Sequence, residues 1–176
     1  MKKIDNLLIE LSACHAAIKW AKNKSWLEIY CTCNRGDWLL WLFARTNSES
    51  LKELALAKGH CANTVRYLML DKRSVRAVDI AIAFGEGNAT LKELNAAYAA
   101  AYAAAYAAAA AINEACYAFA YASYAAADAA AADADADAAA AAAAAANATN
   151  AAKINNQKLT ADICRKYLPI EIWNIK

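Results

Sequence analysis

The thiols and imidazoles of this chain are its side chains best suited to hold a metal. Cys31 and Cys33 form a C-x-C pair, and His60 and Cys61 are adjacent. Structural zinc sites favour C-x-x-C and H-x₃₋₅-H spacings, which neither pair matches. We therefore predict no metal and no cofactor. We expect the six cysteines to be small buried residues kept reduced in a cytoplasmic protein.

Carboxylates are the next candidates, for acid and base catalysis. Asp133, Asp135 and Asp137 alternate with alanine in the sequence. On a helix 133 and 137 are neighbours while 135 points elsewhere, so the three do not converge on one site. Both histidines, His15 and His60, lie in apolar helical contexts that favour a structural role. No nucleophile or phosphate loop stands out, and we predict that the chain is not an enzyme.

Tyrosines follow a helical spacing in the second half of the chain. Tyr98, Tyr102 and Tyr106 recur every four residues, and a second trio follows at i, i+4 and i+7. Each trio forms one side of a helix, which either packs on a neighbouring helix or forms a recognition face. The candidate binding residues, with the acidic residues that extend the surface, are Tyr98, Tyr102, Tyr106, Tyr117, Tyr121, Tyr124, Asp128, Asp133, Asp135 and Asp137.

The segment R-G-D-W-L-L-W-L is the most informative part of the first half. Asp37 is expected to cap the following helix, and Gly36 to allow a tight entry to it. Trp38, Trp41 and Arg45 fall at i, i+3 and i+7 on one side, and leucines fill another. We predict a helix buried on two sides that joins the front half to the alanine-rich helices. The candidate structural motif consists of Arg35, Gly36, Asp37, Trp38 and Trp41.

Alanine dominates the elements that must position these residues. Between Ala96 and Ala152, 38 of 57 residues are alanine, with no Gly, Pro, Lys or Arg. Alanine has the highest helix propensity, and its small side chain lets helices approach closely. One helix from 90 to 152 would be about 95 Å long, too long for a compact domain. We expect the tract to fold back near Asp128, or else to pair between chains.

Helix start signals recur while strand signals are nearly absent. The segments beginning at Ser25, Ser50 and Thr90 each fit the S/T-x-x-E capping box. We predict an all-α, single-domain helical bundle with a long Ala/Tyr-rich helical hairpin, made of a mixed front half (1–90), long Ala-rich helices (91–152) and a C-terminal helix (153–176). The predicted helices are 4–22, 26–33, 38–46, 51–69, 73–84, 91–126, 128–152 and 157–167.

Charge and hydropathy bear on partners. Residues 96–152 carry five acids and no base, whereas the rest of the chain carries 19 bases and 12 acids. This asymmetry steers a charged partner or reflects solvated helix faces. The uncharged stretch 94–113 is poor in the Leu, Ile, Phe and Val that drive membrane insertion, and Asp5 and Glu10 interrupt any signal peptide. We predict a cytoplasmic protein without membrane or nucleic-acid partners.

The order of motifs resembles a known family. It runs from A-C-x-A-x-x-x-W-A (13–21) through C-x-R-G-D-W-L-L-W-L (33–42), G-E-G-N-A-T-L-K-E-L (85–94) and an Ala/Tyr/Asp tract to A-D-I-C-R-K-Y-L-P (161–169). This order resembles the alanine-rich immunity proteins assigned to bacterial polymorphic toxin systems, the fifth numbered family, which also occur in bacteriophage genomes. The resemblance covers nearly the whole chain and implies a cytoplasmic protein that binds and neutralises a toxin.

Two classes of function remain open on the sequence. The first is a binding protein whose partner is a protein, either a toxin or a defence effector. The alternative is a phage-encoded structural or assembly protein, or an inhibitor of host defence that sequesters a protein or a nucleotide. Alanine-faced helices also make a homo-oligomer possible.

Overall fold

The computed structural model describes residues 4–110 and 150–175. These residues form α-helices and two short 3₁₀ helices, without a strand among them, which confirms the predicted all-α class. In chain order the elements are α1 (Ile4–Glu10), α2 (His15–Ala21), α3 (Trp26–Thr32), α4 (Gly36–Thr46), α5 (Leu51–Asn63), η1 (Arg66–Leu68), α6 (Lys72–Gly85), α7 (Leu91–Ala110), α10 (Asn150–Tyr167) and η3 (Ile170–Ile172).

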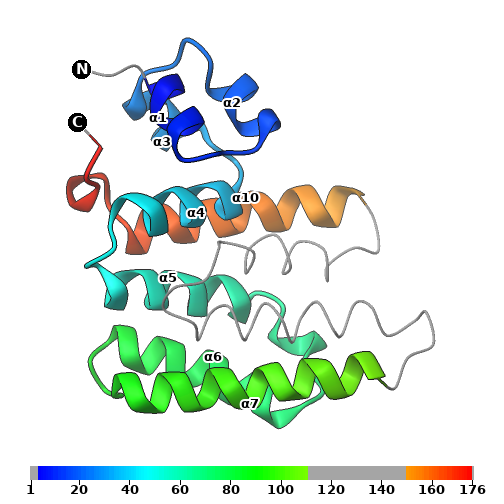
Figure 1. The fold of residues 1–176 in the computed structure, drawn as a ribbon. Helices are drawn as coiled ribbons and strands as arrows, with labels where there is room; N and C mark the ends of the chain where they lie inside the picture. Colours follow the sequence, from blue (N-terminus) through cyan, green and yellow to red (C-terminus); the bar gives the residue numbers. More distant parts are fainter. Residues whose placement is uncertain (1–3, 111–149, 176) are drawn as a thin grey trace.

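The helices are stacked in layers (Figure 1). The short helices α1, α2 and α3 lie at one end, α4 lies beside α10 in the next layer, and α5, α6 and α7 follow in turn. Helix α10 packs on both α4 and α5, α5 packs on α6, and α6 packs on α7. The C-terminal helix is therefore inserted between elements of the front half.

Two hydrophobic clusters form the core, and α5 contributes to both. Leu54 and Cys61 belong to the first cluster, which also takes in α1 to α4, α10 and the C-terminal segment. Ala55 and Ala62 belong to the second, formed with α6 and α7. A helix with apolar residues on two opposite sides is buried between two layers, so α5 links the two halves of the core.

Two of the three predicted capping boxes are confirmed. The amide of Glu28 donates to the Ser25 hydroxyl at 3.2 Å, and the amide of Ser25 donates to the Glu28 carboxylate at 2.6 Å. Thr90 and Glu93 make the same reciprocal pair. At Ser50 the predicted helix start is confirmed, since α5 begins at Leu51, but the predicted capping box was wrong: the Ser50 side chain makes no capping bond, and its backbone lies outside the extended region that a capping residue adopts (ψ 53°).

Two predicted helix ranges were too long. The expected helix 4–22 is two helices, broken where Ser12 adopts a left-handed conformation (φ 60°). Ala13, which follows the break, is partly buried and packs against the first cluster. The expected helix 51–69 ends at Asn63, because the amides of Thr64 and Val65 donate to the carbonyls three residues back, at Cys61 and Ala62, in place of the four-residue α-helical pattern.

The joining role expected for the R-G-D-W-L-L-W-L helix is tested only for the described part of the alanine tract. Helix α4 packs on α10 and α5, whereas α7 packs on α6, so the joining role stays a prediction for the residues of the tract outside the described ranges. The C-terminal helix begins at Asn150 rather than at 157, so it includes residues assigned to the preceding helix. The turn expected near Asp128 lies outside the described residues.

Candidate functional site

Helix α4 supplies the main wall of the candidate site. Arg35 occupies the position before its first turn and makes no side-chain capping bond. Asp37, expected to be the cap, lies inside the first turn, where a carboxylate also interacts favourably with the helix dipole. Its carboxylate pairs with the Arg35 guanidinium through Nε (2.8 Å) and Nη2. The capping prediction was wrong because α4 already begins at Gly36 with Arg35 in the capping position, so Asp37 lies within the helix.

A pocket of about 460 Å³ opens between α4 and the short helices at this end of the molecule. Trp20 of α2 and Trp38 and Trp41 of α4 line it, together with aliphatic side chains from α1 to α4. The Trp20 and Trp38 rings lie 5.9 Å apart, tilted by 57°. Pockets of this size and mainly apolar lining hold small molecules or anchoring side chains.

Each of the three pocket tryptophans has a cation over its ring. Lys24 Nζ lies 4.3 Å from the centre of the Trp20 ring. The guanidinium of Arg35 lies 4.6 Å from the centre of Trp38, and that of Arg45 lies 5.9 Å from the centre of Trp41. Such cation–π contacts hold the rings in place and bring positive charge next to the pocket. Sequence reasoning did not identify Trp20 and Lys24, although their i, i+4 spacing matches that of Trp41 and Arg45.

Two titratable residues of the pocket lining, Arg35 and Cys33, have raised pKa values. The hydrogen bond from Arg35 to Asp37 raises the pKa of the guanidinium, so Arg35 remains charged. Burial raises the pKa of the Cys33 thiol to about 11, and this pocket-lining cysteine is therefore neutral and a poor nucleophile at neutral pH. Neither group has the pKa near 7 that a general acid or base needs.

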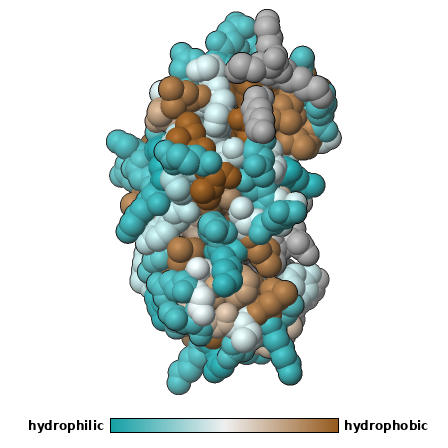
Figure 2. Space-filling view, turned by 90° about the vertical axis from the view of Figure 1, so that its left-hand side faces the viewer, coloured by the Kyte–Doolittle hydropathy of each residue, from teal (hydrophilic) through white to brown (hydrophobic). Residues whose placement is uncertain are grey.

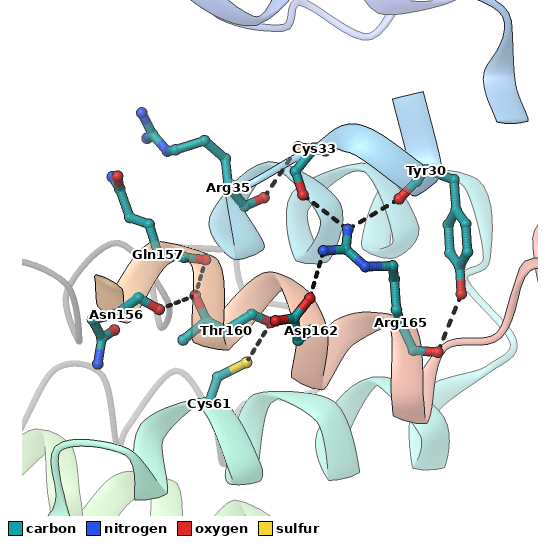
Figure 3. A network of polar contacts seen from close by, with 9 residues as sticks. All are labelled: Tyr30, Cys33, Arg35, Cys61, Asn156, Gln157, Thr160, Asp162 and Arg165. Atoms are coloured by element: carbon teal, nitrogen blue, oxygen red, sulfur yellow. Dashed lines mark hydrogen bonds and ion pairs between the residues drawn. The ribbon is translucent and has the colours of Figure 1, made fainter. Parts of the chain in front are cut away.

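Arg165 of α10 holds the end of α3 through hydrogen bonds (Figure 3). Its Nη1 donates to the carbonyls of Tyr30 (3.0 Å) and Cys33 (2.8 Å), and its Nη2 donates to Asp162 (2.7 Å). Tyr30 in turn donates its hydroxyl to the Arg165 carbonyl at 3.1 Å. Arg165 therefore satisfies carbonyls at the end of α3 and fixes the loop that leads into Arg35 and α4.

Buried thiols complete the contact between α10 and its neighbours. Cys61 Sγ lies 3.7 Å from the Thr160 carbonyl, and Cys164 Sγ lies 3.6 Å from the Gly36 carbonyl. Burial raises the pKa of Cys164 above its ordinary value, which keeps the thiol protonated and able to donate. The segment A-D-I-C-R-K-Y-L-P thus serves mainly to position α4 and the end of α3.

The predicted burial of the cysteines holds only in part. Cys33, Cys61 and Cys164 are buried, as predicted. The prediction was wrong for Cys14 and Cys31, which are exposed because both lie near the ends of short surface helices. Within the described residues no group of three or more His, Cys, Asp or Glu side chains could hold a metal ion.

The tyrosine surface is described only at its start. Tyr98 is half-buried against the second cluster, and Tyr102 is exposed. Their rings lie 5.8 Å apart, consistent with the predicted i, i+4 stripe. Tyr106 belongs to α7, but its side chain is outside the described set. Among the candidate binding residues and the cysteines, those that lie wholly outside the described ranges are Cys116, Tyr117, Tyr121, Tyr124, Asp128, Asp133, Asp135 and Asp137.

Hydrophobic side chains are also exposed outside the pocket. Figure 2 shows the side of the molecule that lies at the left of Figure 1, where patches of hydrophobic residues are interrupted by hydrophilic ones. The large hydrophobic side chains that are most exposed are scattered over several elements: Ile9, Leu27, Tyr67, Leu70 and Ile154. None of the helices in the described ranges is both long and apolar enough to cross a membrane.

The chain was compared with known protein families, curated proteins and solved structures, and none of them matched. The family resemblance noted in the sequence therefore stays a prediction. Its most specific segment, R-G-D-W-L-L-W-L, lies at the start of α4, which packs on α10, the helix that carries most of the closing motif 161–169.

Proposed function

We propose that this chain is a binding protein without catalytic activity, an immunity protein that holds and neutralises a toxin. The pocket beside Trp20, Trp38 and Trp41 is the place where that partner docks. The observation that carries the proposal is the grouping of three tryptophans, each with a cation over its ring, around one open pocket.

Tryptophan and arginine are the residues most enriched among those that dominate binding energy at protein interfaces. Their side chains here are already ordered by the cation–π contacts and by the Arg35–Asp37 pair. A partner would not have to order them on binding, which lowers the entropic cost of association. The resemblance adds to this argument, because its most specific segment contains Trp38 and Trp41.

The proposal is tested by expressing each gene that flanks this one in a bacterial host, with and without the chain. One neighbour is expected to arrest growth, and co-expression of the chain is expected to restore it. A matched vector that carries the gene of this chain with an early stop codon controls for the burden of expression. The proposal fails if no neighbour is toxic, or if a toxic neighbour stays toxic when the chain is present.

Native mass spectrometry separates binding from assembly. An inhibitor is expected to be a monomer or a small oligomer that forms a complex of fixed stoichiometry with the toxic neighbour. A large closed ring or a rod formed by the chain alone would support the structural alternative instead.

A further inference from the structure

We infer that α1 and α2 form a lid over the pocket, which swings as one unit about the loop between α2 and α3 while α3 stays fixed. The inference goes beyond the proposed function, because it concerns a motion of the fold and does not depend on what the pocket binds. It follows from the position of the pocket, from the contacts within each of its sides and from the anchoring of α3.

The pocket lies between two groups of helices. Leu8 of α1 and Ala17 and Trp20 of α2 line one side, whereas Trp38 and Trp41 of α4 line the other. Helix α1 packs on α2, and neither of them packs as extensively on any other helix in the described ranges. In Figure 1 the two helices lie at the top of the molecule, above α4. The space of about 460 Å³ between the two sides lacks the close packing that would hold them at a fixed distance.

Each side of the pocket is ordered by contacts of its own. Lys24, in the loop after α2, lies over the Trp20 ring and donates to the Trp20 carbonyl. On the other side Arg35 lies over the Trp38 ring and pairs with Asp37. Between the sides the rings of Trp20 and Trp38 meet, with centres 5.9 Å apart. This ring contact is apolar, so it can break and form again without leaving a polar group unpaired.

Helix α3 is anchored, which places the hinge between α2 and α3. Arg165 donates to the Tyr30 carbonyl, and the Tyr30 hydroxyl donates to the carbonyls of Arg165 and Leu168. The Tyr30 ring also meets the Trp173 ring, with centres 6.1 Å apart. In the loop that joins α2 to this anchored helix, Asn23 adopts a left-handed conformation (φ 63°). Changes in a few torsion angles of such a loop are enough to swing a rigid pair of helices.

Buried thiols of the unaltered chain can report on this motion. Cys33 lines the pocket between its two sides and is only 2% exposed. Cys61 and Cys164 are buried as well, but they lie outside the pocket lining, where α10 meets α5 and α4. Opening of the lid is therefore expected to expose Cys33 and to leave the other two thiols covered.

The first test is alkylation of the native full chain with iodoacetamide at pH 7.5, followed by mass spectrometry with peptide sequencing. Cys33 is expected to react at least tenfold faster than Cys61 and Cys164, and at least tenfold more slowly than the exposed Cys14 and Cys31. A reaction at Cys33 as slow as at Cys61 and Cys164 would overturn the inference, because only unfolding would then uncover it. A reaction as fast as at Cys14 would overturn it too, because Cys33 would then be accessible without any opening.

Amide exchange separates a swinging lid from local unfolding. A lid that moves as a unit keeps its own hydrogen bonds, such as those from the Ile18 amide to the Cys14 carbonyl (3.1 Å) and from the Ala13 amide to the Leu8 carbonyl (2.8 Å). The opening constant obtained from the protection of these amides is expected to be at least tenfold smaller than that obtained from alkylation of Cys33. Equal constants would show that α1 and α2 unfold instead of swinging, and would refute the lid.

Matched tryptophan variants test the contact that closes the lid. Trp20→Leu removes the ring contact with Trp38, whereas Trp41→Leu removes another pocket tryptophan and leaves that contact in place. Trp20→Leu is expected to speed alkylation of Cys33 at least fivefold, and Trp41→Leu less than twofold. Equal acceleration would contradict the inference, because widening of the pocket alone would then explain it. If circular dichroism shows that Trp20→Leu does not fold, the thiol and amide rates of the unaltered chain decide.

Discussion

Single residues decide how closely α4 and α10 approach. A Cβ atom on Gly36 would lie 2.5 Å from the Thr160 hydroxyl and 2.6 Å from its backbone carbonyl carbon. Real Cβ contacts are not this short, so only glycine allows the two helices to meet here. The sequence predicted a tight entry to α4 at this glycine, but it could not identify Thr160, because the two residues are 124 positions apart.

Gly36→Ala is therefore expected to lower the free energy of unfolding by about 1–3 kcal/mol, as in other overpacked contacts. Helix propensity alone would predict the opposite sign. Urea titration followed by circular dichroism measures the change. Asn34→Ala, an exposed position in the preceding loop, is the control and is expected to change stability by less than about 0.5 kcal/mol. An unchanged or raised stability in Gly36→Ala would show that α4 and α10 do not meet at this glycine.

His60 gives the fold a dependence on pH. Its ring stacks on Tyr167 with centres 4.2 Å apart. Burial lowers the pKa of the imidazole, and the nearby Lys166 lowers it further, against an opposite effect of Glu86. The folded state thus favours neutral His60. Its contribution to stability is complete above the ordinary imidazole pKa near 6.5 and declines as the pH falls through and below that value.

His60→Phe should keep the stacking and abolish this dependence. The free energy of unfolding of the unaltered chain is expected to fall from pH 7.5 to pH 5.5 by more than that of the variant. Carboxylates with lowered pKa values, such as Glu28 and Glu93, are the same in both proteins and cancel in the difference. Parallel stability curves for the two proteins would show that His60 does not titrate in a buried setting.

For the helices, local sequence signals predicted which segments are helical better than the residues at which the helices end. Capping boxes at Ser25 and Thr90 mark true helix starts, because the hydroxyl and carboxylate satisfy the first amides without outside help. The break at Ser12 was not predictable, since it has neither a glycine nor a proline to mark the left-handed residue. The packing of α10 between α4 and α5 likewise has no local signal.

The described part of the alanine tract shows why alanine is used there. Leu94, Ala97 and Ala101 form a buried stripe on α7, which packs on α6. Ala101→Leu is expected to cost about 1–3 kcal/mol, because the added atoms have no space between the helices. Ala103→Leu is the matched control, since Ala103 is exposed on the same helix. Equal melting temperatures for the two variants would disprove close packing of α7 on α6.

For the whole molecule, the sequence predicted only some of the residues of the candidate site. Spacing placed Trp38, Trp41 and Arg45 on one side of a helix, and the structure brings them to the pocket. Trp20 lies on α2 and Lys24 lies in the loop between α2 and α3. No local sequence pattern relates α2 to α4. Pairing of distant helices depends on the shape of the complete core, which a motif does not encode.

The prediction of a single domain has a direct test. All five tryptophans belong to the first cluster, whereas α6 and α7 belong to the second, and α5 is shared. Loss of either cluster exposes one side of α5, so both should unfold together. Urea transitions followed by tryptophan fluorescence and by circular dichroism are expected to have the same midpoint. Two separate midpoints would show that the clusters are independent units.

The proposed function places the protein partner in the pocket beside Trp20, Trp38 and Trp41. Isothermal titration calorimetry measures the binding of the toxic neighbour's product to the unaltered chain, to Ala17→Phe at a residue that lines the pocket, and to Ala16→Phe at an exposed residue outside the lining. We expect Ala17→Phe to raise the dissociation constant at least tenfold, equivalent to about 1.4 kcal/mol or more, and Ala16→Phe to bind like the unaltered chain. Equal affinity for all three proteins would place the partner elsewhere on the molecule.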